Sequence, residues 1–335
     1  MRIGFNPHKD QPQEKSEYLH QVVIPVFIPN QEGYFKDSFK IFQLCLESLF
    51  ATIHDRTFIT IVNNGSDSII SAYLDSLLAQ NKIHELIHTQ NIGKLNAILK
   101  GLSGNNIELV TIADSDVLFL SDWQWETNKV FVNFPKAGVV GIVPQYKTFT
   151  TRCDNMLFDN LFNKAIQFIP VKNPNGLELF YKSIGWGKSN PDYMKLALGY
   201  VNNKGFKVYL GSGHFVATYK KDMFDEIVTY IGYKMGGDSE SYLDAQPLKK
   251  DYWRLTTHDN FAYHLGNTYE KWMSEVTFTA SSAEVFESNF KTFKNVSSVN
   301  YFIKNQLFRK CFKNKKIRRW FYRLKGLPNE MIFKY

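Results

Sequence analysis

The stretch Leu109-Val-Thr-Ile-Ala-Asp114-Ser115-Asp116-Val-Leu-Phe-Leu120 carries two acidic residues inside a run that is otherwise apolar or β-branched. Its first five residues have the composition of a buried strand. A buried, unpaired carboxylate costs on the order of several kcal/mol or becomes protonated, so both acids need a compensating group. Because residues i and i+2 of an extended segment point to the same face, Asp114 and Asp116 can present their oxygens to one cation or ligand. The alternative is that they only cap the following turn.

The residues before this stretch alternate between strand-like and helix-like segments. Four alternations predict a mostly parallel, Rossmann-like α/β sheet flanked by helices on both faces. Ligands of such sheets bind at the carboxyl ends of the strands. Short β-rich runs predict strands at 22–28, 58–62, 86–89 and 109–113, and apolar residues at helical spacing predict helices over 37–54, 69–78 and 94–102. The turns after these strands should therefore line one crevice.

The second half of the chain is less regular. Strand-like segments at 206–210 and 215–219 flank Gly211-Ser-Gly-His214, and helices are expected near 222–231 and around Tyr242 and Leu243. No internal repeat or low-complexity linker marks a domain boundary.

Composition places the chain among folded globular proteins. It has 335 residues, of which 44% are hydrophobic and 21% charged, so neither disorder nor a coiled coil is expected. Its three cysteines lie far apart, which fits a reducing, cytosolic compartment. The first 20 residues are polar and no window of about 18 apolar residues occurs, so we expect neither a secretory signal nor a membrane span.

The net charge of +8 is unevenly distributed. Residues 291–335 hold 13 Lys/Arg against the single acid Glu330, a net +12, which leaves −4 for the rest. Apolar and basic residues interleave over 307–327, a pattern typical of an amphipathic helix lying on an anionic membrane surface. Alternatively the helix docks on the protein with its basic face in water. Nucleic-acid binding is less favoured because no recognised nucleic-acid module accompanies the tail.

Four motifs in order, one at each predicted strand end, resemble glycosyltransferase family 2 on the GT-A fold. They are Val23-Ile-Pro-Val26, Ile61-Val-Asn-Asn-Gly-Ser66, Asn91-Ile-Gly-Lys-Leu-Asn-Ala97 and Asp114-Ser-Asp116. The resemblance covers residues 20–270. It implies that the crevice binds a nucleotide-diphosphate sugar, with a UDP-sugar as the expected donor.

The resemblance also assigns donor contacts. Pro25, Asn63 and Asn64 would lie against the uridine, although the family commonly has Asp in this second turn. Asn91 and Lys94 would approach the diphosphate, where a lysine at a helix start meets phosphate charge. The alternatives are an ordinary turn asparagine and a solvated lysine. Asp114 and Ser115 complete the donor contacts.

A metal site is implied by the same resemblance. Asp114, Asp116 and His264 would hold Mn²⁺ or Mg²⁺, and an imidazole ligand favours manganese. His258 is a competing candidate for the third ligand, and either histidine could instead be a packing residue.

The catalytic base implied by the resemblance is Asp238, in Gly236-Gly-Asp-Ser-Glu240. Glu240 would orient the acceptor. Alternatively, both acids only stabilise the N-terminus of a helix through its dipole. Ser212 and Gly213 would lie under the donor sugar, unless they form only a turn. Trp186 could stack on an acceptor sugar ring.

Together these features predict a metal-dependent, inverting glycosyltransferase of hexosyltransferase type that acts on a glycan or lipid-linked acceptor in cell-surface polysaccharide synthesis. It would be cytoplasmic, with a peripheral position on the inner face of the membrane. Residues 20–120 would bind the nucleotide sugar, 121–275 would hold the acceptor and catalytic half of the same domain, and 285–335 would form the basic helical extension. The alternatives are a nucleotidyltransferase, although no Gly-rich triphosphate loop is evident, and a non-catalytic protein that binds through its basic tail.

Overall fold

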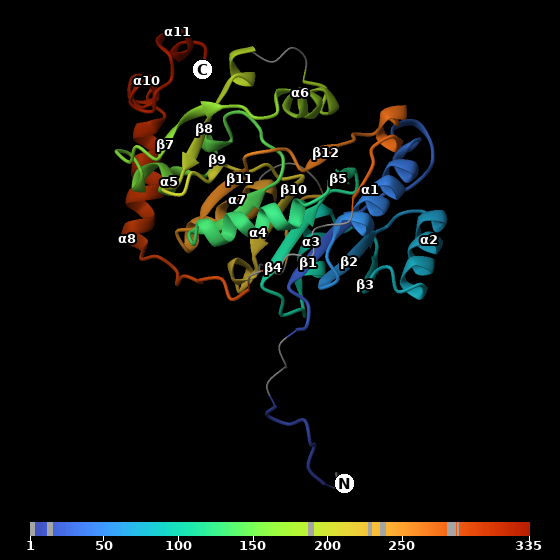
Figure 1. Ribbon diagram of the computed structural model, residues 1–335. Helices are drawn as coiled ribbons and strands as arrows, with labels where there is room; N and C mark the ends of the chain where they lie inside the picture. The colour runs from blue at the N-terminus through green and yellow to red at the C-terminus, as the bar shows by residue number, and fades with distance from the viewer. Residues whose placement is uncertain are drawn as a thin grey trace.

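A large mixed sheet organises the chain. The computed structural model describes residues 4–11, 16–186, 191–226, 230–234, 239–279, 286 and 288–335. Its main sheet has the strand order β3-β2-β1-β4-β10-β6-β11-β9-β8-β7, and β12 and β5 form a separate pair (Figure 1). Helices lie on both faces of the main sheet, as the sequence predicted.

The elements have the following bounds. The strands are β1 His20–Val26, β2 Thr57–Asn64, β3 Glu85–Thr89, β4 Leu109–Ala113, β5 Val117–Phe119, β6 Ala137–Gly141, β7 Ile166–Pro170, β8 Leu196–Val201, β9 Lys207–Leu210, β10 Val216–Lys220, β11 Trp253–Thr257 and β12 Ala262–His264. The α-helices are α1 Ser38–Thr52, α2 Ser68–Ala79, α3 Lys94–Leu102, α4 Trp123–Asn133, α5 Asp154–Asp159, α6 Pro174–Ser183, α7 Ser239–Lys249, α8 Ser298–Tyr301, α9 Phe308–Phe312, α10 Lys315–Leu324 and α11 Asn329–Ile332. Short 3₁₀ turns occur at Gly33–Phe35, Thr148–Thr150, Pro191–Met194, Lys221–Phe224 and Lys271–Ser274, and a π-helical segment spans Phe302–Leu307.

Most strands of the sheet point the same way. Strands β1 to β4, β6, β8 and β11 run in one direction, while β7, β9 and β10 run in the other. The predicted strands and their parallel order in the first half are confirmed. Pro25 is tolerated in β1 because β1 pairs with β4 only as far as Val23, so its missing N–H breaks no bond of that ladder.

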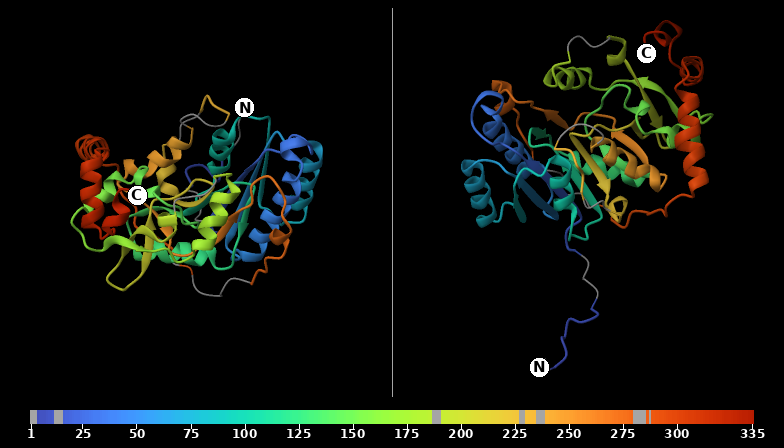
Figure 2. Two further views of the ribbon diagram at one scale, coloured as in Figure 1. Left: turned by 90° about the horizontal axis from the view of Figure 1, so that it is seen from above. Right: turned by 180° about the vertical axis from the view of Figure 1, so that it is seen from behind.

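Alternate residues of β1 face opposite layers, as expected for a strand buried on both sides. Val22, Ile24 and Val26 pack with α1 and α2, whereas Val23 packs with α3 and α7. Figure 2, seen from above, shows α3 and α7 across the sheet from α4. The two layers enclose the strands.

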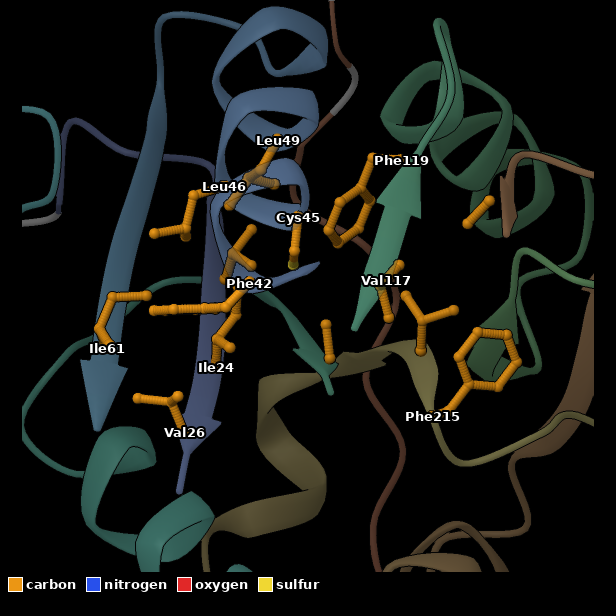
Figure 3. Packing of buried hydrophobic residues seen from close by; sticks show 14 of the residues in the cluster. Ile24, Val26, Phe42, Cys45, Leu46, Leu49, Ile61, Val117, Phe119 and Phe215 are labelled. Atoms are coloured by element: carbon orange, nitrogen blue, oxygen red, sulfur yellow. The ribbon is translucent and has the colours of Figure 1, made fainter. Parts of the chain in front are cut away.

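The apolar core continues directly beneath the two acids. Phe42 and Cys45 of α1 pack with Ile24 of β1 on one side and with Val117 and Phe119 of β5 on the other (Figure 3). All of these side chains are buried. The segment that carries Asp114 and Asp116 is therefore supported from below by packed hydrophobic side chains.

Two expectations about the second half need correction. The helix predicted over 222–231 is wrong: the chain forms a 3₁₀ turn at Lys221–Phe224, and residues 230 and 231 are not helical. The tail is helical, as the sequence predicted, but it is divided into separate helices, because α9 ends at Phe312 and α10 begins at Lys315. The strands near 206–210 and 215–219 and the helix around Tyr242 are confirmed.

The tail is docked on the domain. Phe312, Phe321, Tyr322 and Leu327 are buried in a cluster with residues of α4, α5 and β7 to β9. Apolar positions that the sequence pattern assigned to a membrane surface thus belong partly to the core. The three cysteines are free thiols, and no helix among the described residues has the length and apolar character needed to cross a bilayer.

Buried histidines predict acid sensitivity of the fold. Burial lowers the pKa of His54 to about 4, and its Nδ1 accepts a hydrogen bond from the Arg56 backbone N–H (3.1 Å), which requires an unprotonated nitrogen. Burial also lowers the pKa of His20, whose Nε2 lies 2.6 Å from Thr111 Oγ1. Below pH 6.5 the unfolded chain binds protons that the folded chain does not, so the free energy of unfolding falls between pH 6.5 and 4. We expect roughly 2 kcal/mol of loss from His54 by pH 5.

The measurement is urea unfolding of the wild type and of His54→Gln from pH 7.5 to 5. The glutamine variant should lose less stability over this range because it has no titrating ring. Parallel curves for the two proteins would contradict the assignment.

Candidate active site

The two acids lie where β4 ends and β5 begins. The Asp114 backbone N–H donates to the Phe215 carbonyl (2.7 Å), which places the Gly211–Phe215 segment beside it. The Asp116 carbonyl accepts from the Leu265 N–H (2.8 Å), and the antiparallel β5–β12 pair sets His264 opposite Val117. Backbone pairing therefore brings the second half of the chain to the acidic pair.

His264 is held in a defined orientation beside Asp116. Its Nε2 lies 3.4 Å from Asp116 Oδ2, and its Nδ1 lies 3.0 Å from Ser183 Oγ. The Ser183 hydroxyl donates its hydrogen to the Phe180 carbonyl (2.6 Å), so it accepts from Nδ1–H of the histidine. Nε2, the nitrogen left for a metal, therefore faces Asp116, and the Ser183 contact fixes the orientation of the ring.

Lys94 pairs with the other acid. Its Nζ lies 2.5 Å from Asp114 Oδ1. Lys94 is the first residue of α3, and Gly93 before it adopts φ 89°. A Cβ on Gly93 would lie 2.8 Å from Lys234 Cα, and the Lys94 N–H donates to the Lys234 carbonyl (3.0 Å). Segment 230–234 therefore packs against the first turn of α3, which requires glycine at position 93.

The electrostatic environment of Asp116 favours a bound cation. Burial raises the pKa of Asp116 to about 6, and Asp114 raises it further, while His264 and Lys94 act in the opposite direction. Its Oδ1 is shielded from solvent and has no hydrogen-bond partner among the described residues. Burying a carboxylate oxygen without a hydrogen-bond partner costs free energy, and a bound ligand that contacts the oxygen would remove this cost.

The turn asparagines hold the loops together. Asn63 Nδ2 contacts Ser71 Oγ and His88 Nδ1, both at 3.0 Å, and its Oδ1 accepts from the Ser66 N–H. Asn64 Oδ1 accepts from the Ile92 N–H (3.0 Å), which ties the turn after β2 to the turn after β3. Both side chains are nearly buried. Asn91 Oδ1 accepts from the Gly93 N–H (3.1 Å) and shapes the start of α3.

The other residues predicted to contact the donor lie in or beside β1, β4 and the Gly211–Phe215 segment. Pro25 is buried near the end of β1, and Ser115 is partly exposed in the turn between Asp114 and Asp116. The chain passes Gln145 so closely at Gly213 that a Cβ there would collide with its side chain. Ser212 is buried.

A charged cluster that the sequence did not indicate supports this segment. Arg254 Nη2 donates to the Ser212 carbonyl (2.7 Å) and pairs with Asp244 Oδ1 (2.6 Å). His214 Nδ1 lies 3.1 Å from the same carboxylate oxygen. Arg254 and Asp244 are almost fully buried, so β11 and α7 fix the position of the Ser212–His214 backbone.

Aromatic rings extend from α6 beyond His264. Phe180 stacks on Phe215 with 5.2 Å between ring centroids. Trp186 is 60% exposed and stacks on Tyr181, which in turn stacks on Tyr146 at 4.2 Å. A pocket of about 170 Å³ borders His264 and Ser183. An exposed ring with a packed back face is suited to sugar stacking.

Some predicted residues are not brought together here. Asp238 lies outside the described residues, and of Glu240 the structure gives only its place in the first turn of α7. His258 packs on Tyr209 of β9, whereas His264 contacts Asp116. Among the described residues no group of three or more His, Cys, Asp or Glu side chains is arranged to hold a metal ion.

Comparison with known proteins bears on these features. A family model, glycosyl transferase family 2, matches residues 26–182, which include β2 to β5 and the Asp114–Asp116 turn. Residues 26–182 are thus similar to glycosyltransferase family 2. The matched segment contains three of the four strand-end motifs and overlaps the first. No curated protein matches the chain in sequence.

Solved structures that resemble this chain are distant from it in sequence. Staphylococcus aureus TarS 1–349 in complex with UDP-GlcNAc has a TM-score of 0.44 at 12% identity over 77% of this chain and 61% of that one. GalNAc-T7 with UDP, GalNAc and Mn²⁺ has a TM-score of 0.48 at 9% identity, covering 74% and 44%. The mannosyltransferase PcManGT from Pyrobaculum calidifontis, in complex with GDP-Man and Mn²⁺, has a TM-score of 0.40 at 14% sequence identity. The match covers 74% of this chain and 58% of that one. The chain spans less than two thirds of each of these proteins, and likenesses this distant settle neither substrate nor activity.

Proposed function

We propose that the chain is a metal-dependent, inverting glycosyltransferase that uses a nucleotide-diphosphate sugar, with UDP as the expected nucleotide. The observation that carries the proposal is the pairing of Asp116 with His264 at the carboxyl end of β4, where Asp116 Oδ1 has no hydrogen-bond partner in the described chain. The match to family 2 over residues 26–182 supports the same reading.

The side chains at the end of β4 include the ligand types that a divalent cation takes, and the unpartnered Asp116 Oδ1 supports a cation there. Asp116, Asp114 and the Nε2 lone pair of His264 would hold it, and donor phosphate oxygens would complete the shell, since such ions usually take one or two carboxylates plus substrate phosphates. A bound cation would neutralise the charge that develops on the departing diphosphate. An imidazole ligand favours manganese over magnesium.

The chain's own groups would bind and orient the donor. Lys94 carries its ammonium group to Asp114 at the start of α3, where the helix N-terminus also favours anions. In the donor complex we expect this ammonium to share its charge with the diphosphate. Asn63, Asn64 and Asn91 keep the turns in place around Pro25 and the nucleotide.

Transfer requires a base for the acceptor. Asp238, which directly precedes α7, would accept the proton of the acceptor hydroxyl as its oxygen attacks the anomeric carbon. Glu240 would orient that hydroxyl group. Ser212 and Gly213 would lie under the donor sugar, and Trp186 would stack on a sugar of the acceptor.

The proposed reaction is transfer of a hexose to a glycan or lipid-linked acceptor in cell-surface polysaccharide synthesis. The proposed location is the cytoplasmic side of a membrane, with peripheral attachment. Support comes from the free thiols and from the net charge of +12 in residues 291–335.

The test is a hydrolysis screen of nucleotide sugars with the full chain, with and without Mn²⁺. We expect release of UDP from one UDP-sugar, dependent on metal. Release of pyrophosphate from a nucleoside triphosphate would support a nucleotidyltransferase instead. Failure of every nucleotide with Mn²⁺ to raise the melting temperature would contradict donor binding altogether.

A further inference from the structure

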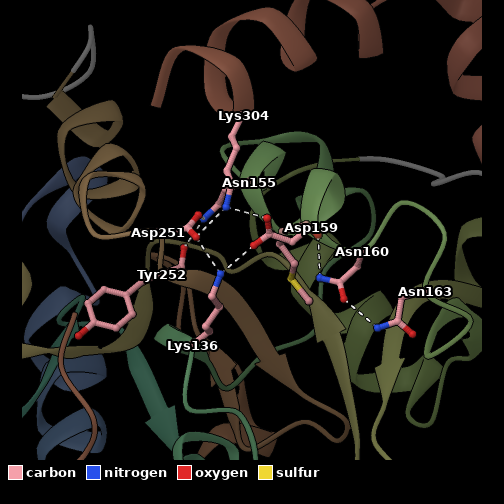
Figure 4. A network of polar contacts seen from close by, with 9 residues as sticks. Lys136, Asn155, Asp159, Asn160, Asn163, Asp251, Tyr252 and Lys304 are labelled. Atoms are coloured by element: carbon pink, nitrogen blue, oxygen red, sulfur yellow. Dashed lines mark hydrogen bonds and ion pairs between the residues drawn. The ribbon is translucent and has the colours of Figure 1, made fainter. Parts of the chain in front are cut away.

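The C-terminal tail is fixed to the domain through its inner side. Lys304 Nζ lies 2.7 Å from Asp159 Oδ1 and 2.8 Å from Asp251 Oδ2, and Lys136 pairs with the same two acids (Figure 4). Lys325 is buried and its Nζ donates to the carbonyls of Asn160 (2.9 Å) and Asn163 (2.8 Å). These bonds hold α10 in one orientation relative to the sheet.

The outward side of α10 carries an apolar stripe. Ile317, Trp320 and Leu324 follow the i, i+3, i+7 spacing of one helix face, and they are 38%, 45% and 45% exposed. Two other residues of the same helix are buried, Phe321 beside the stripe and Tyr322 on the opposite side. Phe162, which is 76% exposed, extends the stripe, because its ring centroid lies 6.3 Å from that of Trp320.

Basic residues of the same helix border this stripe. Lys316 and Arg323 lie beside it, whereas Lys315 and Arg319 lie farther round the helix, where Arg319 covers the Phe333 ring at 4.4 Å. Among the ion pairs of the described residues, those formed by the tail involve Lys304 and Lys334. The charges of Lys316 and Arg323 therefore remain available to a partner. We call these two basic residues, together with Ile317, Trp320, Leu324 and Phe162, the α10 outer face.

The charge and the apolar residues of the α10 outer face distinguish between three possible binding partners. A second copy of the chain would bring two tails of net charge +12 together, which repels. A nucleic acid would match the charge but would leave three aliphatic and aromatic side chains in contact with water. An anionic bilayer matches both parts, since apolar side chains enter the acyl boundary and Lys/Arg meet the headgroups.

We propose that the α10 outer face is the docking surface for an anionic lipid bilayer. The surface is a fixed face of a docked helix, so no folding step is needed on binding. The proposal rests on the peripheral location suggested above but not on the transfer reaction, because α10 lies at the end of the sheet that carries β7 and β8, away from β3 (Figures 1 and 2).

The experiment is co-sedimentation of the full chain with vesicles of phosphatidylcholine alone or with 30 mol% phosphatidylglycerol, without nucleotide. We expect binding to the anionic vesicles at 0.1 M salt and at least tenfold weaker binding to the neutral ones. Phe162→Ser/Trp320→Ser and Lys316→Glu/Arg323→Glu should each weaken binding at least tenfold. The matched controls Ile69→Ser and Lys36→Glu/Lys82→Glu, which change exposed residues elsewhere, should bind like the wild type.

Three results would overturn the proposal. One is equal binding to both kinds of vesicle or to neither. Another is equal weakening by the control variants, which would indicate diffuse charge rather than this face. A third is a dimer in sedimentation velocity that Phe162→Ser/Trp320→Ser dissociates, which would assign the face to a second copy. Because the assay contains no donor, a failed hydrolysis screen leaves its outcome unaffected.

Discussion

Replacing Asp116 with Asn abolishes metal-dependent hydrolysis of the donor. Asn keeps the shape of the side chain but removes the negative charge that would attract a divalent ion. In addition, the NH₂ group of Asn is a hydrogen-bond donor and cannot ligate a cation. We expect a loss of roughly 10³-fold, the scale on which single electrostatic contributions to a transition state are measured. The fold should persist, because burial of this carboxylate already raises its pKa to about 6.

The measurement is release of UDP over a range of Mn²⁺ concentrations. Asp225→Asn, a change of an exposed carboxylate that pairs with Lys250, serves as the matched control and should retain activity. A rate for Asp116→Asn within a few-fold of the wild type would refute the metal role of this residue.

Asp238→Asn separates donor binding from transfer. The variant lacks the group that takes the acceptor proton, so transfer should fall by roughly 10²- to 10⁴-fold. The thermal stabilisation by UDP with Mn²⁺ should stay as in the wild type, because the proposed donor contacts lie at β4 and α3. Glu240→Gln should reduce transfer less.

The rate of transfer and the thermal stabilisation by UDP with Mn²⁺ can be measured on one preparation, by a transfer assay and a melting curve. Normal turnover of Asp238→Asn would move the base to another residue. Loss of the UDP shift in this variant would mean that residue 238 acts on the donor side.

The first half of the fold was predictable because its strands are buried on both faces. Such strands appear as continuous apolar runs, and 109–113 coincides with β4 Leu109–Ala113. The position of Asp114 and Asp116 at its carboxyl end followed from the same run. The family match over residues 26–182 then confirmed the resemblance that the strand-end motifs indicated.

The partners of the acidic pair were not predictable from local patterns. β5 and β12 have three residues each, too few for periodicity, and their pairing joins residues about 145 positions apart. Ser183 gave no signal either, because its contact with His264 depends on how α6 packs in the tertiary structure. The resemblance proposed His264 as a metal ligand, and the β5–β12 ladder explains how it comes to lie beside Asp116.

The tail shows what periodicity leaves open. An apolar helix face indicates that something covers it but does not say what. In α10 the domain covers Phe321 and Tyr322, and Ile317, Trp320 and Leu324 remain outside. The sequence pattern alone did not distinguish the buried from the exposed apolar residues of α10.

The central claim is that the carboxyl end of β4 binds a divalent cation together with a nucleotide diphosphate. The most direct measurement is a crystal structure of the full chain soaked with MnCl₂ and UDP, with anomalous data at the manganese edge. We predict one strong anomalous peak within ligand distance of Asp116 and His264 Nε2, with UDP bound beside it. UDP bound without a peak at this position, or a peak and nucleotide elsewhere on the protein, would contradict the account.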